Sequence, residues 1–332
     1  MNINEIMQML AAPDAEALYA DARSVTDAIF GKSVYVRGVV EFSNYCKKNC
    51  HYCGLRAANV NLERFRLHAE DIYAAAALAV ELGAGTIVLQ SGEDLACDVA
   101  FIGSLVRRIK DTHDVAITLS VGDHDRDTYA FWRDCGADRY LLKIETTDID
   151  LHERLRPGST VEDRLARVQT LQELGYETGS GIIVGLPGMT DEIIAKDLKL
   201  LSSLGLGMIA AGPFIPHPQT PLAAPVDTDI EKSLRVTAML RLLNKGSNIP
   251  ATSALDALVA DGRIRGLAAG ANVVMPSVTP DDVRGGYSIY PGKNTAGKDV
   301  QDAVLSLMER LRTAGYRPVA EKGFSKLSET AS

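Results

Sequence analysis

Residues 34–53 read VYVRGVVEFSNYCKKNCHYC, and the first nine of them, Val34–Phe42, are rich in β-branched and aromatic residues without a proline. Such a run predicts a buried β-strand. The strand leads directly into three cysteines, Cys46, Cys50 and Cys53. In barrels of alternating strands and helices, functional side chains follow the carboxyl ends of the strands, so this stretch predicts both a fold class and the position of a site.

Outward from this stretch, strand-like runs alternate with segments of helical periodicity. The helical segments are Glu70–Leu82, Phe101–Asp111, Val161–Leu174, Ile193–Leu204 and Ile230–Leu243. Gly83, Gly175 and Gly205 follow three of them, which favours left-handed C-caps. Regular alternation predicts a parallel sheet with right-handed crossovers. We therefore expect a complete (β/α)8 TIM-type barrel, whose strands are Val34–Phe42, Thr86–Gln90, Ala116–Leu119, Tyr140–Glu145, Gly179–Val184, Met208–Ala211, Ile249–Ser253 and Val273–Met275.

The 332 residues suit a single domain, because barrels of this class commonly exceed 250 residues around one core. Two helical patterns, roughly 2–11 and 14–30, make residues 1–30 an N-terminal helical cap. The barrel then spans 31–322. Residues 323–332 are polar, and we expect them to be a frayed tail.

The charge and the start of the sequence restrict its partners. The net charge is -8 and no basic run is present, which argues against nucleic acid. The sequence shows neither signal-peptide features nor an apolar stretch of ~18 residues, so no membrane partner is expected. These observations favour a soluble, cytoplasmic protein.

The cysteine spacing, Cys46-x3-Cys50-x2-Cys53, places three soft thiolates on one loop, which suits an iron–sulfur cluster. A cubane has four irons, so one iron would lack a protein ligand. The alternative is a zinc site that adds His51 or another histidine, although this spacing fits zinc poorly. The two remaining cysteines, Cys97 and Cys135, stand alone and are interpreted as small buried apolar residues.

This motif, including Tyr52 directly before Cys53, resembles that of the radical S-adenosylmethionine (SAM) superfamily. The resemblance implies a 4Fe-4S cluster whose ligands, and central catalytic residues, are Cys46, Cys50 and Cys53. It also implies that the amino and carboxylate groups of SAM chelate the open iron. One electron from the cluster then cleaves SAM to methionine and a 5′-deoxyadenosyl radical.

One further segment and two single residues fit a SAM site. Ser91-Gly92-Glu93 follows the second strand and resembles the superfamily's glycine-rich strand that contacts the SAM amino group; an ordinary turn is the alternative. Glu145 ends the fourth strand and Arg164 begins the next helix. Their side chains suit the ribose hydroxyls and the SAM carboxylate, respectively, whereas the alternative is an ordinary surface ion pair.

Longer motifs narrow the resemblance to the HydE family, the radical SAM maturases of FeFe-hydrogenase. The likeness covers nearly the whole chain and is carried by Glu41–Arg56, Thr86–Asp94, Val184–Gly188, Gly212–Pro218, Asn248–Thr252 and Tyr290–Lys293. It implies a small anionic substrate deep in the barrel. In the maturase role this is an iron–cysteine complex carrying carbon monoxide and cyanide, made by a partner enzyme, to whose sulfur the radical adds.

The resemblance also assigns residues. Tyr287 and Tyr290 match SAM-contacting positions, and the substrate-carboxylate pocket is matched by Thr118, Lys143, Thr252 and Ser253. Two positions depart from the family: Lys143-Ile144 stands where Arg-His is frequent, and Ser253 where Thr is common. Lysine lacks the bidentate fork of arginine, so the substrate is open to question. Some members bind an accessory cluster through C-terminal cysteines, but Lys293-Asn294-Thr295-Ala296 continues with none, so we expect one cluster.

Three functions stay open at this point. The first is a maturase that works with a reductant such as flavodoxin or ferredoxin and with other hydrogenase maturases. The second is a related radical SAM amino-acid mutase such as methylornithine synthase; biotin synthase fits less well, because lone Cys97 and Cys135 cannot hold its sacrificial cluster. The third is an iron–sulfur electron carrier or a structural zinc protein.

Overall fold

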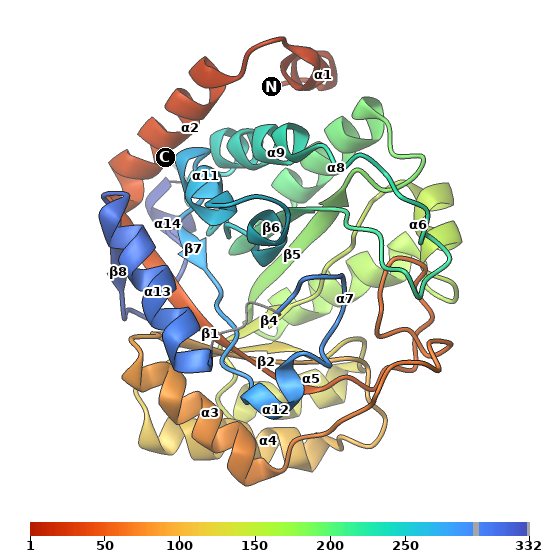
Figure 1. Ribbon diagram of the computed structural model, residues 1–332, viewed down its shortest axis with the longest axis vertical. Coiled ribbons are helices and arrows are strands. Elements are labelled where there is room, and N and C mark those ends of the chain that lie inside the picture. Colours follow the sequence, from red (N-terminus) through yellow and green to blue (C-terminus); the bar gives the residue numbers. More distant parts are fainter. Residues whose placement is uncertain (295–298, 331–332) are drawn as a thin grey trace.

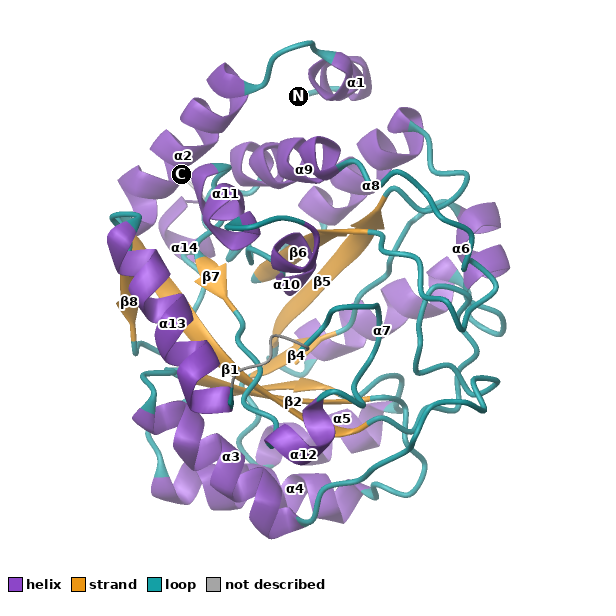
Figure 2. Ribbon diagram, viewed as in Figure 1, coloured by secondary structure: helices purple, strands orange, loops and turns teal. Residues whose placement is uncertain are grey.

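A curled parallel β-sheet forms the centre of the molecule (Figure 2). The structure is a computed structural model that describes residues 1–294 and 299–330, so Thr295, Ala296 and the last two residues of the expected tail lie outside the described residues. The strands follow the spatial order β6-β5-β4-β3-β2-β1-β7, and β8 pairs with β1. Their bounds are β1 Ser33–Ser43, β2 Thr86–Ser91, β3 Ala116–Ser120, β4 Arg139–Leu141, β5 Glu177–Val184, β6 Met208–Pro213, β7 Val273–Val274 and β8 Arg317–Val319.

Helices connect the strands and cover the outside of the sheet (Figure 1). Half of the described helices begin where an Asp or Thr side chain accepts a hydrogen bond from a free backbone N–H of the first turn, as Thr160 does from Asp163. Their bounds are α1 Ile3–Ala11, α2 Glu16–Phe30, α3 Ala69–Glu81, α4 Val99–Thr112, α5 Arg126–Asp134, α6 Ile149–Leu155, α7 Val161–Glu173, α8 Asp191–Ser203, α9 Ile230–Leu243, α10 Ser253–Leu258, α11 Gly262–Ala268, α12 Asp281–Arg284, α13 Val300–Thr313 and α14 Leu327–Thr330.

The helices that the periodicity predicts are confirmed to within two residues at each end, as α3, α4, α7, α8 and α9. The three glycines that follow helices adopt positive φ: 89° at Gly83, 80° at Gly175 and 61° at Gly205. Each therefore ends its helix in the left-handed conformation that glycine adopts without steric cost.

The prediction of a seventh strand at Ile249–Ser253 is wrong. Residues 248 and 250 make only single bridges, to β6 and β7, and Ser253 already begins α10. Pro250, the second residue of the predicted strand, has no N–H to donate, which interrupts the ladder. The fourth strand is also shorter than expected, because its ladder ends at Leu141. The regular strands thus form a curled sheet of β/α type in which 248–250 stands between β6 and β7.

A further strand, β8, was not predicted. It pairs with the beginning of β1 through Ser33, Val34 and Tyr35. Its three residues include Pro318 and carry no alternation pattern, which explains why the sequence gives no signal for it.

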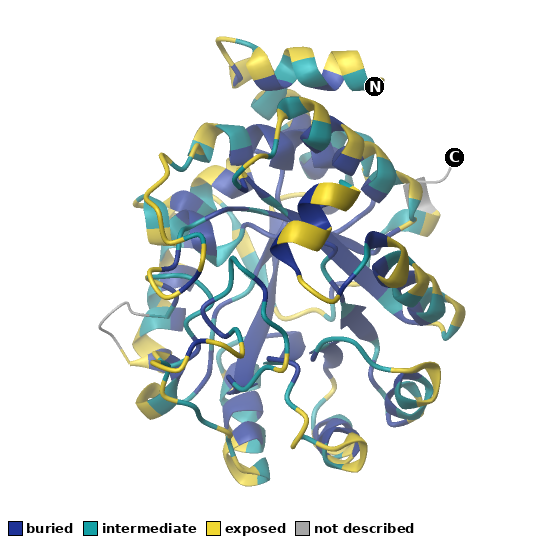
Figure 3. Ribbon diagram, turned by 90° about the vertical axis from the view of Figure 1, so that its right-hand side faces the viewer, coloured by how far each residue is buried: buried dark blue, intermediate teal, exposed yellow. Residues whose placement is uncertain are grey.

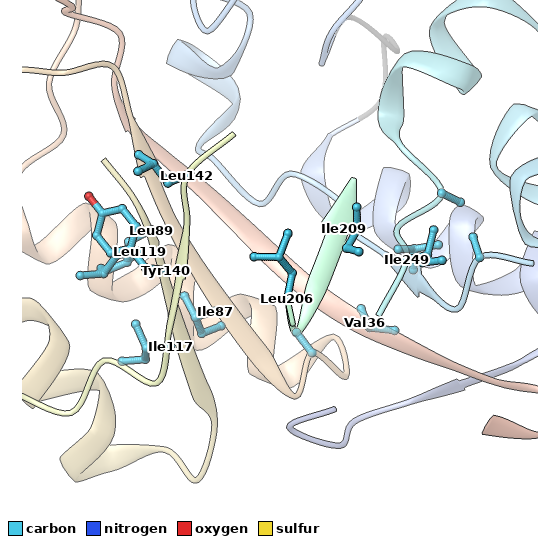
Figure 4. Close-up of a cluster of buried hydrophobic side chains, with 14 of the residues drawn as sticks. Val36, Ile87, Leu89, Ile117, Leu119, Tyr140, Leu142, Leu206, Ile209 and Ile249 are labelled. Atoms are coloured by element: carbon cyan, nitrogen blue, oxygen red, sulfur yellow. The ribbon is translucent and has the colours of Figure 1, made fainter. Parts of the chain in front are cut away.

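The core lies between the sheet and the helices. Figure 4 shows side chains of this core, among them Ile87, Leu89, Ile117 and Leu119 of two adjacent strands, and all four are fully buried. Burial of each such side chain stabilises the fold by about 1.5–3 kcal/mol. Figure 3 shows the complementary pattern, in which the strands are buried and the outer faces of the helices are exposed.

The two ends of the chain pack onto this framework. Helix α1 contacts α8, and α2 contacts α9. Near the C-terminus, the backbone oxygen of Lys322 accepts a hydrogen bond from Arg139, and the Phe324 ring lies 4.2 Å from the guanidinium carbon of Arg139. Residues 323–326 of the expected tail also make contacts with the rest of the chain. Among the described residues, no helix combines the length and apolarity needed to cross a membrane.

Candidate active site

A cavity of about 350 Å³ opens where the strands β1 to β6 end. Its lining includes all three clustered cysteines and every predicted cofactor- or substrate-binding residue except Thr118. Thr118 is buried on β3 two residues before Ser120, on the same face, and only Ser120 reaches the lining. The fold therefore brings together residues from 46 to 290 at one end of the sheet.

Backbone hydrogen bonds hold the loop that carries the cysteines, residues 44–56, against neighbouring segments. The Lys47 N–H donates to the oxygen of Glu93 at 2.9 Å, His51 donates to Leu155 at 2.8 Å, and Gly54 donates to Ile289 at 3.1 Å. These partners follow β2, end α6 and precede Tyr290. The thiols are thus positioned by the same segments that supply the other candidate residues.

Gly92 is required by the close approach of the loop. A Cβ atom at this position would lie 2.2 Å from the backbone oxygen of Tyr45 and 2.8 Å from the Cβ of Cys46. The first contact is with backbone, which cannot rotate away, so only glycine fits. The Ser91-Gly92-Glu93 segment and the first cysteine are in direct contact.

Beside the thiols lies a buried network of charges around two carboxylates, Glu93 and Asp123. Arg156 lies 3.3 Å from Glu93, Lys48 lies 3.1 Å from Asp123, and Arg164 pairs with Asp123. Burial, together with the nearby Asp123 charge, raises the pKa of Glu93. Burial alone would also raise the pKa of Asp123, but the charges of Arg164 and Arg156 hold it well below its usual range. Asp123 therefore stays ionised.

Tyr52 connects this network to the cysteine loop. Its hydroxyl accepts a hydrogen bond from Arg156 at 3.2 Å. Burial, and then the proximity of Cys50, raise the pKa of Tyr52 well above its usual value, so the phenol is neutral. Arg156 thus bridges Tyr52 and Glu93.

Lys143 and Glu145 form an ion pair with 2.8 Å between Nζ and Oε2. Glu145 has a φ of 74°, which is rare for a residue other than glycine. This backbone is held from both sides, because the Glu145 N–H donates to Gly181 and its oxygen accepts from Ile183. Lys143 is expected in the substrate site and Glu145 in the cofactor site. In the structure they pair with each other in the lining of one cavity.

Hydroxyl groups line another part of the cavity. Ser253 and Tyr290 share a hydrogen bond of 2.6 Å between their oxygens. The hydroxyl of Thr252 is buried, and no described residue makes a hydrogen bond to it. Tyr287 is buried near Glu41 and the cysteines, and burial followed by the Glu41 charge raises its pKa well above the usual value. Thr252 lines the cavity, and its hydroxyl keeps an unused donor and acceptor.

Known proteins resemble this chain along its whole length. Residues 40–201 match the model of the radical SAM superfamily. Over 311 residues the chain is 44% identical to the FeFe hydrogenase maturase subunit HydE of Thermotoga maritima, covering 94% of this chain and 89% of that protein. The chain belongs to the HydE family of radical SAM proteins.

This HydE-family chain also resembles methylornithine synthases. It is 28% identical over 328 residues to 3-methylornithine synthase of Methanosarcina barkeri, covering 97% of this chain and 91% of that protein. A crystal structure of a methylornithine synthase superposes with a TM-score of 0.85 at 27% identity, covering 99% of this chain and 96% of that chain. The arrangement of strands and helices is therefore that of radical SAM proteins.

Radical SAM proteins use a 4Fe-4S cluster and SAM, and the cysteine loop fits such a cluster. All five cysteines are free thiols, and burial raises the pKa of Cys46 and of Cys53. A thiolate at such a position needs a strong local positive charge, which iron supplies. No three His, Cys, Asp or Glu side chains of the described residues converge to hold one metal ion. A cubane does not require this, because each thiolate binds a different iron.

Four residues of the site were not predicted from the sequence, namely Lys48, Asp123, Arg156 and Lys293. The last of these pairs with Glu41. Asp123 follows the end of β3, so reading that strand end would have found it. The carboxylate of Glu41 is fully buried, and its Oε1 lies 2.5 Å from Nζ of Lys293. Burial would raise the pKa of Glu41, but the Lys293 charge lowers it below its usual value. A charged residue inside a buried strand is the sequence signal for such a pair.

Asp197 of α8 predicts a pH effect on stability. Its Oδ1 accepts from the backbone and hydroxyl of Thr147, just after Glu145, while Oδ2 has no hydrogen-bond partner among described residues. Burial raises its pKa to about 6, above the usual 3.8. Because the pKa of Asp197 is higher in the folded state than in the unfolded state, its carboxyl group stabilises the fold fully at a pH below 3.8. This stabilisation is lost as the pH rises through about 6. Asp197→Asn should therefore raise the free energy of unfolding by about 2–3 kcal/mol at pH 8.

The same substitution should change stability little at pH 4, where the aspartate is protonated in the fold. Urea unfolding of the metal-free protein at both pH values measures the effect. A gain of the same size at both pH values would show that ionisation of Asp197 is not its cause.

Proposed function

We propose that this chain is a radical SAM maturase that acts in assembly of the FeFe-hydrogenase active site, on a small cysteine-derived anion. The observation that carries the proposal is the cavity in which three cysteine thiols, two arginines and Lys143 meet in a chain 44% identical to HydE over nearly its full length. A reductant such as flavodoxin or ferredoxin, other hydrogenase maturases and a cytoplasmic location belong to the same proposal.

The cysteines Cys46, Cys50 and Cys53 would hold the cluster. Together the bound cluster and SAM supply reductive cleavage, which yields a 5′-deoxyadenosyl radical. The Glu93 carboxylate suits the SAM amino group, because it is buried beside the cysteine loop. Arg164 suits the carboxylate of SAM. The same proposal gives Ser91 and Gly92 a backbone contact with SAM, and gives Tyr52, Glu145, Tyr287 and Tyr290 places around it.

The substrate would lie against Lys143, Thr252 and Ser253, with Thr118 beneath. The lysine and the unpaired Thr252 hydroxyl offer a charge and a hydrogen bond to a carboxylate, which offsets the cost of burying it. Apolar side chains such as Met208, Met275 and Ile289 line the rest of the cavity and limit water near a reactive radical.

We also propose that the 332 residues form one domain, a complete barrel that α1 and α2 cap. It is supported by the bridges that 248 and 250 make to β6 and β7, which span the space between the sheet edges. The contacts of α1 with α8 and of α2 with α9 support the cap.

A related amino-acid mutase is the second candidate, because the fold superposes on a methylornithine synthase with a TM-score of 0.85. Anaerobic reconstitution with iron and sulfide, followed by incubation with SAM, dithionite and either the iron–cysteine complex or a mixture of free amino acids, separates the two. Mass spectrometry should detect 5′-deoxyadenosine in both incubations and a modified product from the iron–cysteine complex. A rearranged amino acid in the second incubation would favour the mutase. A reduced cluster that does not cleave SAM would indicate that the protein is an iron–sulfur electron carrier instead.

Lys143→Ala tests the substrate pocket. We expect SAM cleavage without substrate to remain measurable, while the KM for the iron–cysteine complex rises by about 10- to 100-fold, because a charge-assisted hydrogen bond contributes ~1.5–3 kcal/mol. Lys196→Ala, an exposed lysine on α8, is the matched control and should behave as wild type. Equal loss of substrate-free SAM cleavage and of substrate turnover would show that Lys143 does not belong to the substrate pocket.

A further inference from the structure

Glu41 is a carboxylate inside β1, and its side chain is fully buried. Four described side chains donate hydrogen bonds to it. Lys293 Nζ lies 2.5 Å from Oε1, the side-chain amide of Asn294 lies 3.3 Å from the same oxygen, and the Ser277 hydroxyl lies 2.5 Å from Oε2. Thr279 also donates to Oε2. All four donors come from the part of the chain between β7 and α13, so one buried carboxylate gathers that part onto β1.

Lys293 belongs to a segment that carries two of the proposed SAM contacts, Tyr287 and Tyr290. We call residues 286–294 the tyrosine segment; in Figure 1 it is the blue loop that follows α12. The Lys293 ammonium lies 5.3 Å from the centre of the Tyr287 ring, and the Lys293 N–H donates to the backbone oxygen of Tyr290 at 3.4 Å. One lysine therefore contacts both tyrosines as well as the buried carboxylate.

The tyrosine segment also lies against the loop that carries the cysteines. The Asn44 amide donates to the backbone oxygen of Gly286 at 2.9 Å, and the Gly54 N–H donates to that of Ile289 at 3.1 Å. A Cβ atom at Gly54 would lie 2.1 Å from the backbone oxygen of Ser288, so the two segments are in direct backbone contact. A displacement of the tyrosine segment would therefore change the space between its tyrosines and the thiols.

The tyrosine segment contains neither helix nor strand, so no regular ladder of hydrogen bonds fixes it. Its position depends instead on single contacts. Lys293 is 8% exposed, and among the described residues Glu41 is the carboxylate with which it pairs. Neither charge can move away without leaving the other buried and unpaired, which is strongly unfavourable. The pair therefore holds the end of the segment more firmly than a neutral hydrogen bond would.

We propose that Glu41 and Lys293 are positioning residues, which hold Tyr287 and Tyr290 at the distance from the cysteine loop that SAM binding requires. This inference rests on the proposed function, because it takes SAM as the cofactor of the site. Glu41 is fully buried and does not line the cavity, so it acts through Lys293 and not by contact with SAM.

Glu41→Gln tests the position of the tyrosine segment without turnover. The substitution keeps an oxygen that accepts from Ser277 and Thr279, but it leaves Lys293 without its charge partner. Hydrogen exchange of the reconstituted protein, measured by mass spectrometry, should become at least ~tenfold faster in residues 286–294, because the segment opens locally. The Kd for SAM, measured by calorimetry, should rise at least ~tenfold. Iron content should stay that of wild type, because the cysteine loop keeps its other backbone contacts.

Glu177→Gln is the matched control. Glu177 pairs with the buried Arg139 at 3.0 Å between Oε2 and Nε, and neither residue lines the cavity. Both substitutions should lower the free energy of unfolding, because each leaves a buried cation without its charge partner. Only Glu41→Gln should change SAM affinity and hydrogen exchange in the tyrosine segment. Equal changes of SAM affinity in the two variants, or wild-type affinity in Glu41→Gln, would overturn the positioning role.

The double variant Glu41→Gln/Lys293→Met separates position from stability, and it supplies the comparison if Glu41→Gln alone does not fold. No charge is left buried alone, so the free energy of unfolding should return close to that of wild type. SAM affinity should stay low, because the ammonium beside the Tyr287 ring is gone. Recovery of both quantities would mean that the pair only stabilises the fold, which overturns the proposal. Failure of the wild type to bind SAM would instead contradict the proposed function and leave the exchange result standing.

Discussion

Cys50→Ala is expected to reduce bound iron and sulfide to background and to lower 5′-deoxyadenosine formation at least ~100-fold. Loss of a residue that only supports a metal ligand lowers metal affinity or activity by about 10–100-fold. Cys50 is proposed to bind the cluster itself, so a larger effect is expected. Its side chain lines the cavity and is buried beside Tyr52, so no water can readily replace the thiolate. Iron and sulfide analysis, with electron paramagnetic resonance of the reduced protein, measures the outcome.

Cys97→Ala is the matched control for this substitution. The Cys97 thiol lies 3.5 Å from a carboxylate oxygen of Asp94 and does not line the cavity. Iron content and SAM cleavage should be those of wild type. Retained iron and activity in Cys50→Ala, or their loss in Cys97→Ala, would contradict the assignment of the cluster ligands.

Gly92→Ala should have the second-largest effect. The added Cβ would overlap the backbone oxygen of Tyr45, so either the cysteine loop or the end of β2 must shift, at a cost of about 1–3 kcal/mol or more. We expect iron content to fall several-fold and the affinity for SAM to fall by at least ~tenfold, measured by iron analysis and isothermal titration calorimetry.

Gly285→Ala is the glycine control. A Cβ at this position meets no atom within 4 Å, and the residue already has a helical backbone with a φ of −61°. Iron content and SAM affinity should therefore be unchanged. A Gly92→Ala protein with full iron content and normal SAM affinity would show that the close approach to Tyr45 is not needed for the site.

Much of the fold follows from local patterns. Helical periodicity and the glycines after helices predict α3, α7 and α8 and their left-handed ends, because these features depend on residues within a few positions of one another. The seventh strand could not be assigned in this way. Ile249–Ser253 has the composition of a strand, but Pro250 and the start of α10 at Ser253 limit it to single bridges.

The candidate site also contains residues that could be predicted from the sequence and residues that could not. The cysteines, Glu93 and Glu145 follow strand ends, so their meeting could be predicted once a parallel sheet was expected. The pair of Glu41 and Lys293 joins residues 252 positions apart. Arg156 reaches Tyr52 and Glu93 from the end of α6. A charged residue inside a buried strand, such as Glu41, indicates that a partner is needed, but which residue becomes the partner depends on side-chain directions in the folded molecule.

Glu145 stands in a conformation that its residue type disfavours, at a cost of about 1–3 kcal/mol. Glycine at this position would relieve that cost and would also remove the carboxylate that pairs with Lys143. Glycine at residue 145 is therefore expected to raise the stability of the fold and to lower the proposed activity. A laboratory selection that rewards thermal tolerance alone is expected to discard this glutamate early, whereas a selection that requires turnover is expected to retain it.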